Sequence, residues 1–256
     1  MTLGKALKLN KNQSVISICG GGGKTSTLFS LAEELKDFKV LITTTTKIMK
    51  PQSSELFDLI IEESSLEFIK RINSEKTKNI VLCGSSTSSD SHKLKGCSPA
   101  FVDDVKDFFD YVIIESDGSA GRPIKAPALH EPVICNSTNI YIGVIGLDCL
   151  GQKADTENVH RPELFSLIRG KNESDLITEN DLIKLINHPL GLFKNIPEGC
   201  RRIVLLNKAD LVSDETGKRI AKTLANGSEK PLHVVLNSFR NNEAVIFSEK
   251  AGIVLD

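Results

Sequence analysis

The chain has 256 residues, which is enough for one large α/β domain. Its hydrophobic share of 40% and charged share of 25% are ordinary for a globular protein with a buried core. The net charge of -1 excludes a global field that would attract nucleic acid or an anionic membrane, so we expect neither as a partner.

The sequence contains no recognisable targeting or membrane segment. Residues 1–13 lack an apolar stretch of signal-peptide length, and apolar runs such as residues 141–147 are short and interrupted by glycine. The six cysteines and five histidines are scattered, without the close spacing of a zinc site. We therefore expect a cytoplasmic protein with reduced thiols.

Predicted strands and helices alternate along the chain. Residues 14–19 form a β-branched run that stops at four glycines, and residues 24–35 follow with apolar side chains at helical spacing. Further strands are predicted at residues 40–42, 59–61, 79–83, 111–115, 140–145, 202–206 and 233–236. Further helices are predicted at residues 64–72, 100–109, 162–169, 178–186 and 213–224, the last two with Thr178 and Ser213 as N-caps. The alternation predicts an α/β fold with a mostly parallel sheet flanked by helices.

Two polar stretches interrupt this alternation. Residues 84–99 are rich in serine and predict a long mobile loop, either a functional lid or an unstructured surface excursion. Residues 148–159 connect the middle of the sheet to a helical insert around residues 159–200. Because no repeat and no clear linker occurs, residues 1–256 are predicted to form a single domain.

The glycine run is the strongest functional motif. Gly20, Gly21, Gly22 and Gly23 stand between the first strand and the first long helix, and Lys24, Thr25 and Ser26 open that helix. Glycines let backbone N–H groups approach a phosphate closely, and the helix N-terminus attracts an anion. Lys24 would reach the β and γ phosphates, and the Thr25 hydroxyl would ligate Mg²⁺. The motif predicts a three-layer P-loop NTPase-like domain.

This loop departs from the usual pattern G-x-x-x-x-G-K-[ST], which has glycine at the position of Ile18. The shorter run is similar to the tight phosphate loop of the Mur ligases. The alternative is a glycine-rich turn that only connects a strand to a helix.

Two acidic residues follow the predicted strand at residues 111–115. P-loop proteins hold magnesium with an acidic residue at the end of a buried strand, and Glu115 and Asp117 both qualify. Their spacing of two residues points both side chains the same way. Asp117 is the preferred ligand, because Gly118 would let the loop turn toward the γ-phosphate. Either acid could instead serve only to form a turn.

Further polar residues stand where ligands bind in open α/β sheets. Thr45 and Lys47, in the polar run that ends the second strand, are predicted to complete the magnesium shell or hold an anionic substrate. The alternative is that this run finishes an edge strand. Arg122 is a candidate transition-state arginine in a segment punctuated by prolines. The remaining candidates for substrate binding are Lys125, His130, Glu131 and, more weakly, His160.

The strand at residues 202–206 runs into Asn207, Lys208 and Asp210, the N-K-x-D pattern of GTP-binding proteins. A carboxylate at this position accepts hydrogen bonds from N1–H and the 2-amino group of guanine. Adenine has neither donor and would leave the acid unpaired. The motif therefore favours GTP over ATP, although Asp210 could simply begin a helix.

In this order the motifs resemble the YqeC family, accessory proteins for selenium-dependent molybdenum hydroxylases. The resemblance rests on residues 18–26, 41–51, 113–127, 130–132, 159–165 and 205–211. It implies a single P-loop domain whose nucleotide site includes residues 20–25, 43–47, Glu115, Asp117 and residues 207–210. It also implies a molybdenum hydroxylase, or its maturation machinery, as the partner.

Three functions are compatible with these residues. The preferred one is a nucleotide hydrolase that uses Mg²⁺ with GTP or ATP and couples turnover to maturation of a molybdenum hydroxylase. In this reading Lys24 stabilises the transferring phosphoryl group, and no residue is identified that positions the attacking water. The second is an ATP-dependent ligase or kinase that activates a small anionic substrate. The third is a nucleotide-gated binding protein with little turnover, whose switch would be residues 43–47 or 84–99.

Overall fold

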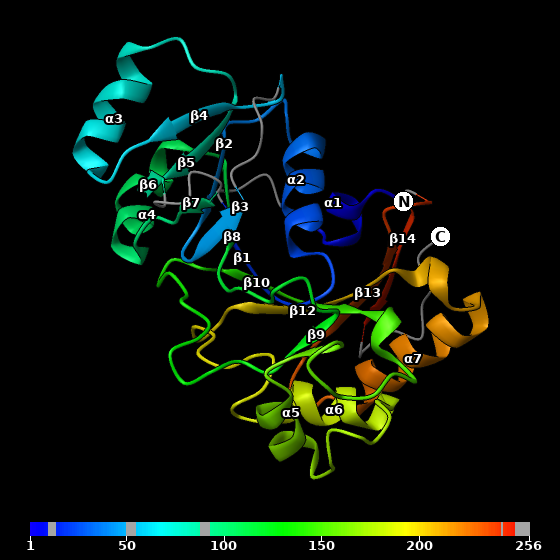
Figure 1. Cartoon of the computed structure of the whole chain (residues 1–256). Helices are drawn as coiled ribbons and strands as arrows, with labels where there is room; N and C mark the ends of the chain where they lie inside the picture. The colour runs from blue at the N-terminus through cyan, green and yellow to red at the C-terminus, as the bar shows by residue number, and fades with distance from the viewer. Residues whose placement is uncertain (10–13, 50–54, 88–92, 242, 249–256) are drawn as a thin grey trace.

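A nine-stranded sheet forms the centre of the computed structural model, which describes residues 1–9, 14–49, 55–87, 93–241 and 243–248 (Figure 1). The strand order is β14-β13-β12-β10-β1-β8-β2-β5-β4. Neighbouring strands run parallel, except that β14 at one edge is antiparallel to β13. In chain order these strands are β1 (Ser14–Gly20), β2 (Val40–Thr44), β4 (Asp58–Ile61), β5 (Ile80–Gly84), β8 (Tyr111–Glu115), β10 (Ile140–Gly146), β12 (Arg201–Asn207), β13 (His233–Ser238) and β14 (Glu243–Ser248).

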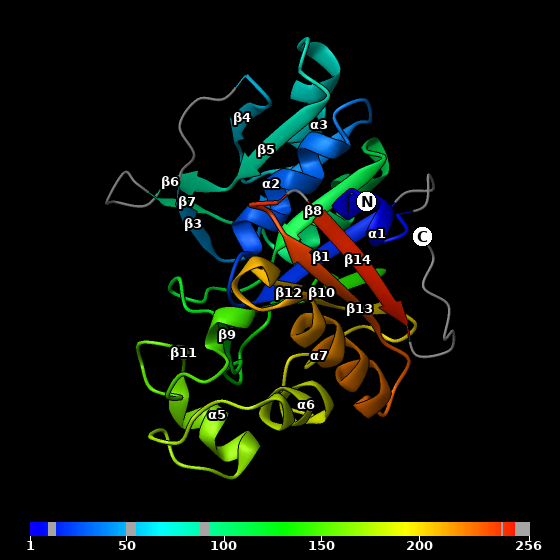
Figure 2. The ribbon, with the colours of Figure 1, turned by 90° about the vertical axis from the view of Figure 1, so that its right-hand side faces the viewer.

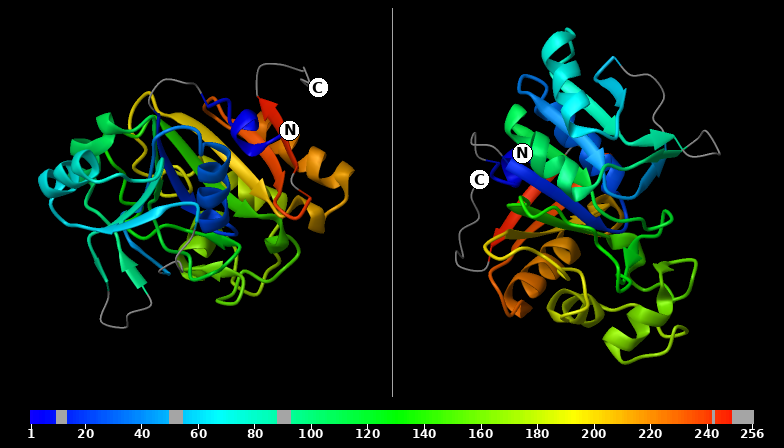
Figure 3. Two further views of the ribbon diagram at one scale, coloured as in Figure 1. Left: turned by 90° about the horizontal axis from the view of Figure 1, so that it is seen from above. Right: turned by 90° about the vertical axis from the view of Figure 1, so that its left-hand side faces the viewer.

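Helices cover both faces of this sheet (Figures 1 and 3). The buried residues of α1 and α2 form one hydrophobic cluster with one face of the strands, and those of the other helices form two clusters on the opposite face. The predicted α/β architecture with a mostly parallel sheet between helical layers is confirmed. The helices are α1 (Leu3–Ala6), α2 (Lys24–Glu34), α3 (Ser65–Ser74), α4 (Pro99–Val105), α5 (Pro162–Arg169), α6 (Glu179–Asn187) and α7 (Asp214–Gly227).

The central strand β1 explains why the strands read as continuous apolar runs. All of its residues are buried. Ile16 and Ile18 belong to the same cluster as Leu28 of α2, whereas Val15 belongs to the cluster that contains Phe68 of α3. Successive side chains point to opposite faces, and because each face is covered by helices, both sets must be apolar.

The predicted strands and helices occur at their predicted positions, but several short elements were not predicted. Thr178 forms a capping box with Asp181 at the start of α6, and the Ser213 side chain accepts a hydrogen bond from the Thr216 N–H, as expected of N-caps. The unpredicted β14 pairs with β13 and lies beside the N-terminus, where Ala244 and Met1 exchange backbone hydrogen bonds (Figure 2). Within the described residues, no helix combines the length and apolarity that crossing a membrane requires.

The segment predicted as an irregular mobile loop contains strands. The described parts of residues 84–99 contribute β6 (Ser86–Thr87) and β7 (Lys93–Lys95), which join β3 (Lys47–Met49) in a small antiparallel sheet, while residues 88–92 lie outside the described residues. Leu94 is fully buried in this sheet. Each strand is too short for its alternation to stand out in a serine-rich sequence.

The predicted helical insert packs on the main sheet. It contributes β11 (Val159–His160), α5 and α6, and β11 pairs with β9 (Ile124–Lys125) in a two-stranded parallel sheet. Buried side chains of α5, α6 and α7 share a cluster with β10, β12 and β13. The β9–β11 pair brings residue 160 beside the segment that follows β8, which matters for the site below.

Candidate functional site

The glycine loop lies at the carboxyl end of β1, the middle strand of the sheet. β8 pairs with β1 on one side and β10 on the other, and the loop leads directly into α2 at Lys24. The next strand in the chain, β2, lies beyond β8, so the connection that leaves β1 runs in the opposite direction from those that lead from β8 to β10 and from β10 to β12. Ligands in open α/β sheets bind in the crevice at such a divergence, beyond the carboxyl ends of the strands.

Glycine is required at Gly23 for two separate reasons. Its φ is 131°, a conformation that side chains with a Cβ rarely adopt. A Cβ built there would also lie 2.2 Å from Nδ2 of Asn207. The loop therefore keeps its shape only without a side chain at this position, and its backbone stays accessible from the side of the helix.

Three backbone amides of the loop are already hydrogen-bonded within the protein, whereas the N-terminus of the helix that follows has no side-chain cap. Those of Gly20, Gly21 and Gly22 are bonded internally, to Asp117, to the Val144 carbonyl and to the Arg122 carbonyl. The N-terminus of α2 behind them, at Gly23, has no side-chain cap. The first-turn amides of an uncapped helix carry a partial positive charge and attract an anion.

A cavity of about 630 Å³ opens at this uncapped helix end. Its volume is in the range of small-molecule sites. The residues that line it come from the glycine loop and α2, the small β3–β7 sheet, and the segment after β8: Gly22, Gly23, Lys24, Thr25, Ser26, Lys47, Ile48, Met49, Lys93, Glu115, Gly118, Ser119, Ala120, Gly121 and His160.

The Lys24 ammonium is buried among acceptors at the floor of the cavity. Its Nζ donates to the Gly20 carbonyl and to Oγ of Ser119, both at 2.8 Å. It also lies 3.5 Å from Asp117 Oδ1 and 3.8 Å from Glu115 Oε1. These acids lie close enough to compensate the positive charge of the buried lysine next to the helix N-terminus.

Glu115 is paired with the first hydroxyl of α2. Thr25 Oγ1 donates to Glu115 Oε2 at 2.8 Å. Burial raises the pKa of Glu115, although Lys24 and the Thr25 hydroxyl oppose this rise. A hydroxyl oxygen and a carboxylate held together at the edge of a cavity are oxygen donors of the type that Mg²⁺ prefers.

Asp117, which the sequence favoured as the metal ligand, is held in a different way. Both of its carboxylate oxygens lie within hydrogen-bonding distance of the Gly20 N–H, at 3.2 and 3.1 Å. Its Oδ2 is 3.0 Å from Nζ of Lys125, and its Oδ1 faces Lys24. Asp117 thus connects the glycine loop to Lys125, and it is not among the residues that line the cavity.

Lys125 is the centre of a second buried charge cluster. Its Nζ lies 2.8 Å from Oε2 of Glu131, and Glu131 also pairs with Arg161 at 2.5 Å. Burial alone would raise the pKa of Glu131, but the hydrogen bonds and charges of Lys125 and Arg161 outweigh it and lower the pKa to about 2. Lys125 and Glu131 therefore fasten the segment after β8 to β11, whereas the sequence suggested that they contact substrate.

The threonine run after the second strand has internal partners for its hydroxyls. Those of Thr43, Thr44 and Thr45 donate to the carbonyls of Cys83, Glu115 and Val133, and Thr46 shares a hydrogen bond with Thr44. Thr45 does not line the cavity, but Lys47 does. The alternative that this run finishes an edge strand is wrong, because β2 lies between β8 and β5.

Arg122 and His160 flank the site in different ways. The Arg122 backbone carbonyl supports the loop by accepting the Gly22 N–H, but the residue does not line the cavity. His160 does line it, positioned by the β9–β11 pairing. Burial, together with the charges of Arg161 and Lys125, lowers the pKa of His160, so its imidazole is neutral at neutral pH.

The N-K-x-D residues lie on the opposite flank of the glycine loop. Asn207, the last residue of β12, donates from Nδ2 to the Gly22 carbonyl at 2.8 Å. Asp210 accepts a hydrogen bond from Oγ of Ser238 at 2.8 Å, and Lys208 pairs with Asp148. The strand and the loop motif are thus joined through one side chain.

Three residues that stabilise this arrangement were not predicted from the sequence. Ser119 accepts the Lys24 ammonium, Asn237 donates to Oδ1 of Asn207 at 3.0 Å, and Ser238 donates to Asp210. Asn237 and Ser238 end β13, the parallel neighbour of β12. Their position at the carboxyl end of a predicted strand was the available signal, but the neighbour of that strand is known only from the fold.

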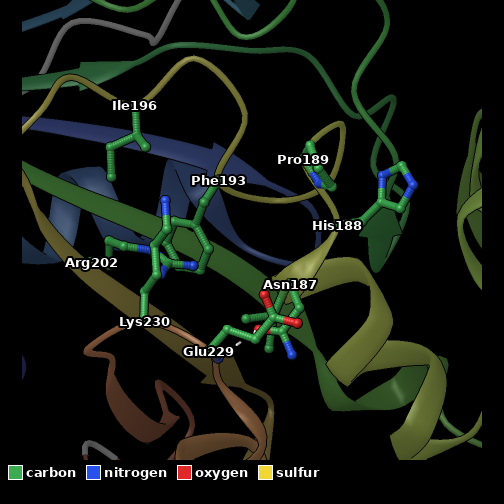
Figure 4. Close-up of a pocket in the computed structure, with 9 residues that line it drawn as sticks. Asn187, His188, Pro189, Phe193, Ile196, Arg202, Glu229 and Lys230 are labelled. Atoms are coloured by element: carbon green, nitrogen blue, oxygen red, sulfur yellow. Dashed lines mark hydrogen bonds between the residues drawn. The ribbon is translucent and has the colours of Figure 1, made fainter.

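A second cavity, of about 270 Å³, lies at the amino end of β12 (Figure 4). The Arg202 guanidinium lies 4.2 Å from the centre of the Phe193 ring, and the Asn187 side chain accepts the Glu229 N–H. Arg202 stands at the start of β12, whereas Asn207 at its end contacts the glycine loop. This cavity is therefore separate from the cavity at the glycine loop.

Comparison with known proteins identifies similar sequences but no similar solved structure. The family model described as YqeC protein matches residues 16–163, which is more than half of the chain. An Escherichia coli (strain K12) protein described as uncharacterized protein YqeC is 39% identical over 206 residues, covering 79% of this chain and 78% of that protein. No solved structure matches the chain.

Proposed function

The chain belongs to the YqeC family, and we propose that it binds a magnesium–nucleoside triphosphate at the glycine loop and hydrolyses it, with GTP preferred to ATP. The observation that carries this proposal is the position of Lys24. Its buried ammonium lies at an uncapped helix N-terminus, next to a hydroxyl–carboxylate pair and a cavity. That combination suits a phosphate chain with a bound cation.

Phosphate oxygens would replace the acceptors that the Lys24 ammonium now contacts. They would accept from Lys24 and from the first-turn amides of α2. As charge moves onto the leaving phosphate oxygens, the fixed cation and amides stabilise it without reorganisation. Ser119 and Gly118, which line the cavity above Lys24, would close around the terminal phosphate.

Magnesium, in this proposal, is held by Thr25 and Glu115, and Asp117 serves as the anchor of the loop. Support comes from the contact between the Thr25 hydroxyl and Glu115 and from the two lysines and the Gly20 amide that already surround Asp117. A bound divalent cation would also favour the ionised form of Glu115, whose pKa burial raises.

Exchanging the two acids for amides separates these roles. Glu115→Gln is expected to raise the Mg²⁺ concentration for half-maximal nucleotide turnover by about tenfold or more, because a carboxylate ligand is lost. Asp117→Asn is expected to leave that concentration within about twofold while lowering the melting temperature, because it removes a buried charge from two lysines. Titration of turnover with Mg²⁺, alongside thermal unfolding, measures both. The assignment fails if Asp117→Asn produces the larger magnesium shift.

Base recognition is proposed at Asn207 and Asp210. Asn207 touches the phosphate loop, and Asp210 is held by Ser238 at the end of the neighbouring strand. A nucleotide with its phosphates at Lys24 would therefore extend toward β12, where the Asp210 carboxylate would accept from the guanine N1–H and 2-amino group.

The test is nucleotide affinity with Mg²⁺, for GTP and ATP, in the wild type and in Asp210→Ala. The wild type is expected to prefer GTP, and the variant is expected to lose about 1–3 kcal/mol of GTP affinity, roughly tenfold to a hundredfold, with little change for ATP. Asp214→Ala is the matched control, because Asp214 is an exposed acid that pairs with Lys218 across one turn of α7. A preference for ATP in the wild type, or a GTP affinity unaffected by Asp210→Ala, would contradict the proposal that the protein is a GTPase.

The biological role proposed with this activity is maturation of a molybdenum hydroxylase, which rests on the family resemblance of the sequence motifs. Cells that lack the chain should accumulate molybdenum hydroxylase protein with reduced activity, and the wild-type chain should restore it. A Lys24→Met variant should not, if turnover is needed. Full hydroxylase activity without the chain would rule out this role but would not affect the nucleotide site.

A further inference from the structure

We propose that the cavity contains a second anion site, formed by Lys47 and Lys93, that binds a small molecule carrying phosphate or carboxylate groups beside the terminal phosphate of the nucleotide. This inference rests on the proposed function, because it assigns the part of the cavity that a nucleotide would leave open. Four observations lead to it: the face of the β3–β7 ribbon, its charge, its distance from the base site, and the position of Met49.

The lysines stand on one face of the paired strands β3 and β7, which form a ribbon within the three-stranded β3-β7-β6 sheet. In the antiparallel pairing of β3 with β7, Lys47 lies opposite Lys95 and Met49 lies opposite Lys93. Ile48 and Leu94, between them, point to the other face and are buried. Because successive side chains alternate, the ribbon places its apolar residues inward and its lysines on the exposed face.

The charge on this face is unbalanced. Like charges directly opposite each other on paired strands destabilise the pairing, and Lys47 and Lys95 are such a pair. Within the part of the chain that the structure describes, none of Lys47, Lys93 and Lys95 forms an ion pair with an acid. An anion bound in the cavity against Lys47 and Lys93 would offset part of this positive charge and gain charge-assisted hydrogen bonds.

The ribbon lies on the side of the phosphate loop that faces away from the base site. β2, which leads into β3, is two strands from β1 in one direction, and β12, which carries Asn207, is two strands from β1 in the other. With strands about 4.8 Å apart, each lies roughly 10 Å from β1. A nucleotide that extends from Lys24 toward β12 would leave the part of the cavity lined by Lys47 and Lys93 open.

Met49 indicates that the ligand is more than an inorganic ion. Its side chain is 67% exposed and lines the cavity next to the two lysines. An exposed, adaptable apolar side chain beside two cations suits a small organic anion, with charged groups toward Lys47 and Lys93 and carbon atoms against Met49. Such a molecule would lie between the ribbon and the terminal phosphate, the place of a second substrate or effector.

The test uses 3-phosphoglycerate, a small molecule with one phosphate and one carboxylate, titrated calorimetrically into protein saturated with Mg²⁺ and a non-hydrolysable GTP analogue. The wild type is expected to bind it, and Lys47→Ala/Lys93→Ala is expected to lower the affinity about tenfold or more. Affinity in the wild type should also fall as salt is raised. The matched control is Lys36→Ala/Lys76→Ala, which removes the same charge from exposed positions outside the cavity.

Separate readouts distinguish the two proposals. Affinity for the GTP analogue should be unchanged in the control Lys36→Ala/Lys76→Ala, and in Lys47→Ala/Lys93→Ala it should fall far less than the affinity for 3-phosphoglycerate, because the two lysines share the cavity with the nucleotide but bind the second anion. If the analogue binds but 3-phosphoglycerate does not, or binds equally well without Lys47 and Lys93, the second site is overturned and the nucleotide proposal stands. If the analogue does not bind at all, the proposed function fails. In that case, 3-phosphoglycerate is titrated into protein without nucleotide. Weaker binding of 3-phosphoglycerate by Lys47→Ala/Lys93→Ala than by the wild type remains the expected result, and equal binding overturns the lysine site.

Discussion

Replacing Lys24 with methionine is expected to slow nucleotide hydrolysis about 10²–10³-fold, the usual effect of removing one fixed donor from a developing negative charge. The Lys24 ammonium is the only side-chain cation named above that lies both at the α2 N-terminus and within reach of Glu115, Asp117 and Ser119. Methionine keeps the length and apolar stem of the side chain but provides neither charge nor a hydrogen-bond donor. Single-turnover hydrolysis with saturating Mg²⁺ measures the effect.

Two variants make this result specific. Lys36→Met, at an exposed position just after α2, should leave the rate unchanged. Thermal unfolding of Lys24→Met shows whether the site remains folded. We expect it to, since Asp117 keeps Lys125 and the Gly20 amide, and Glu115 keeps Thr25. A folded Lys24→Met protein that hydrolyses nucleotide at the wild-type rate would contradict the assignment of the phosphate site.

Lys125→Met is expected to lower the free energy of unfolding by about 3 kcal/mol, at the lower end of the range for breaking a buried ion pair by removing one partner. Lys125 is 1% exposed and faces two carboxylates, Asp117 and Glu131. Without the lysine, both acids stay buried with only part of their compensation, from Lys24 and from Arg161. Chemical denaturation at neutral pH provides the measurement, and Lys76→Met is the exposed control.

A double-mutant cycle separates the ion pair from the loss of packing. Glu131→Gln should lower the free energy of unfolding by less in the Lys125→Met background than in the wild type. In that background there is no Lys125 ammonium for the Glu131 carboxylate to pair with, so its replacement breaks no Lys125–Glu131 ion pair. Additive effects would mean that Lys125 acts through its aliphatic stem alone. The same cycle with Asp117→Asn examines the other arm of the cluster.

The dependence of the free energy of unfolding on pH, in the acid range, provides a second measurement on this cluster. The pKa of Glu131 is lowered from 4.5 in the unfolded chain to about 2 in the fold. Its stabilising contribution is therefore complete above a pH of 4.5 and is lost as the pH falls toward about 2. In Lys125→Met the pKa of Glu131 should rise, so this part of the stability should be lost at a higher pH than in the wild type.

Local sequence patterns were sufficient for the elements that build the main sheet. Strands β1, β8 and β12 are apolar along their length because both faces are covered, and the helices between them have apolar residues on one side. The turn at the glycine run likewise follows from the sequence, because Gly20, Gly22 and Gly23 adopt positive φ angles that favour glycine. Short strands such as β6 and β7 were missed, because two or three residues carry no detectable period.

Individual roles within the site depended on distances between segments far apart in the chain. Glu115 and Asp117 are equivalent by spacing, but α2 places the Thr25 hydroxyl on Glu115, and β9 places Lys125 on Asp117. The threonines at 43–46 look like ligands by composition, yet the neighbouring strands β5 and β8 provide carbonyl acceptors for two of their hydroxyls, and Val133, in the segment before β10, provides the third. Such pairings are decided by strand order, which local sequence does not encode.

The sequence by itself therefore determined the α/β architecture, and it contains the glycine run with Lys24 and Thr25 and the N-K-x-D pattern, because each depends on the conformational preference or hydrogen-bonding groups of adjacent residues. Only the tertiary structure decided that Asn207 contacts the loop, that Lys125 and Glu131 are buried together, and that Lys47 and Lys93 share one wall of the cavity. These contacts join residues separated by several strands and helices, and burial and charge at such distances arise only when the sheet has assembled.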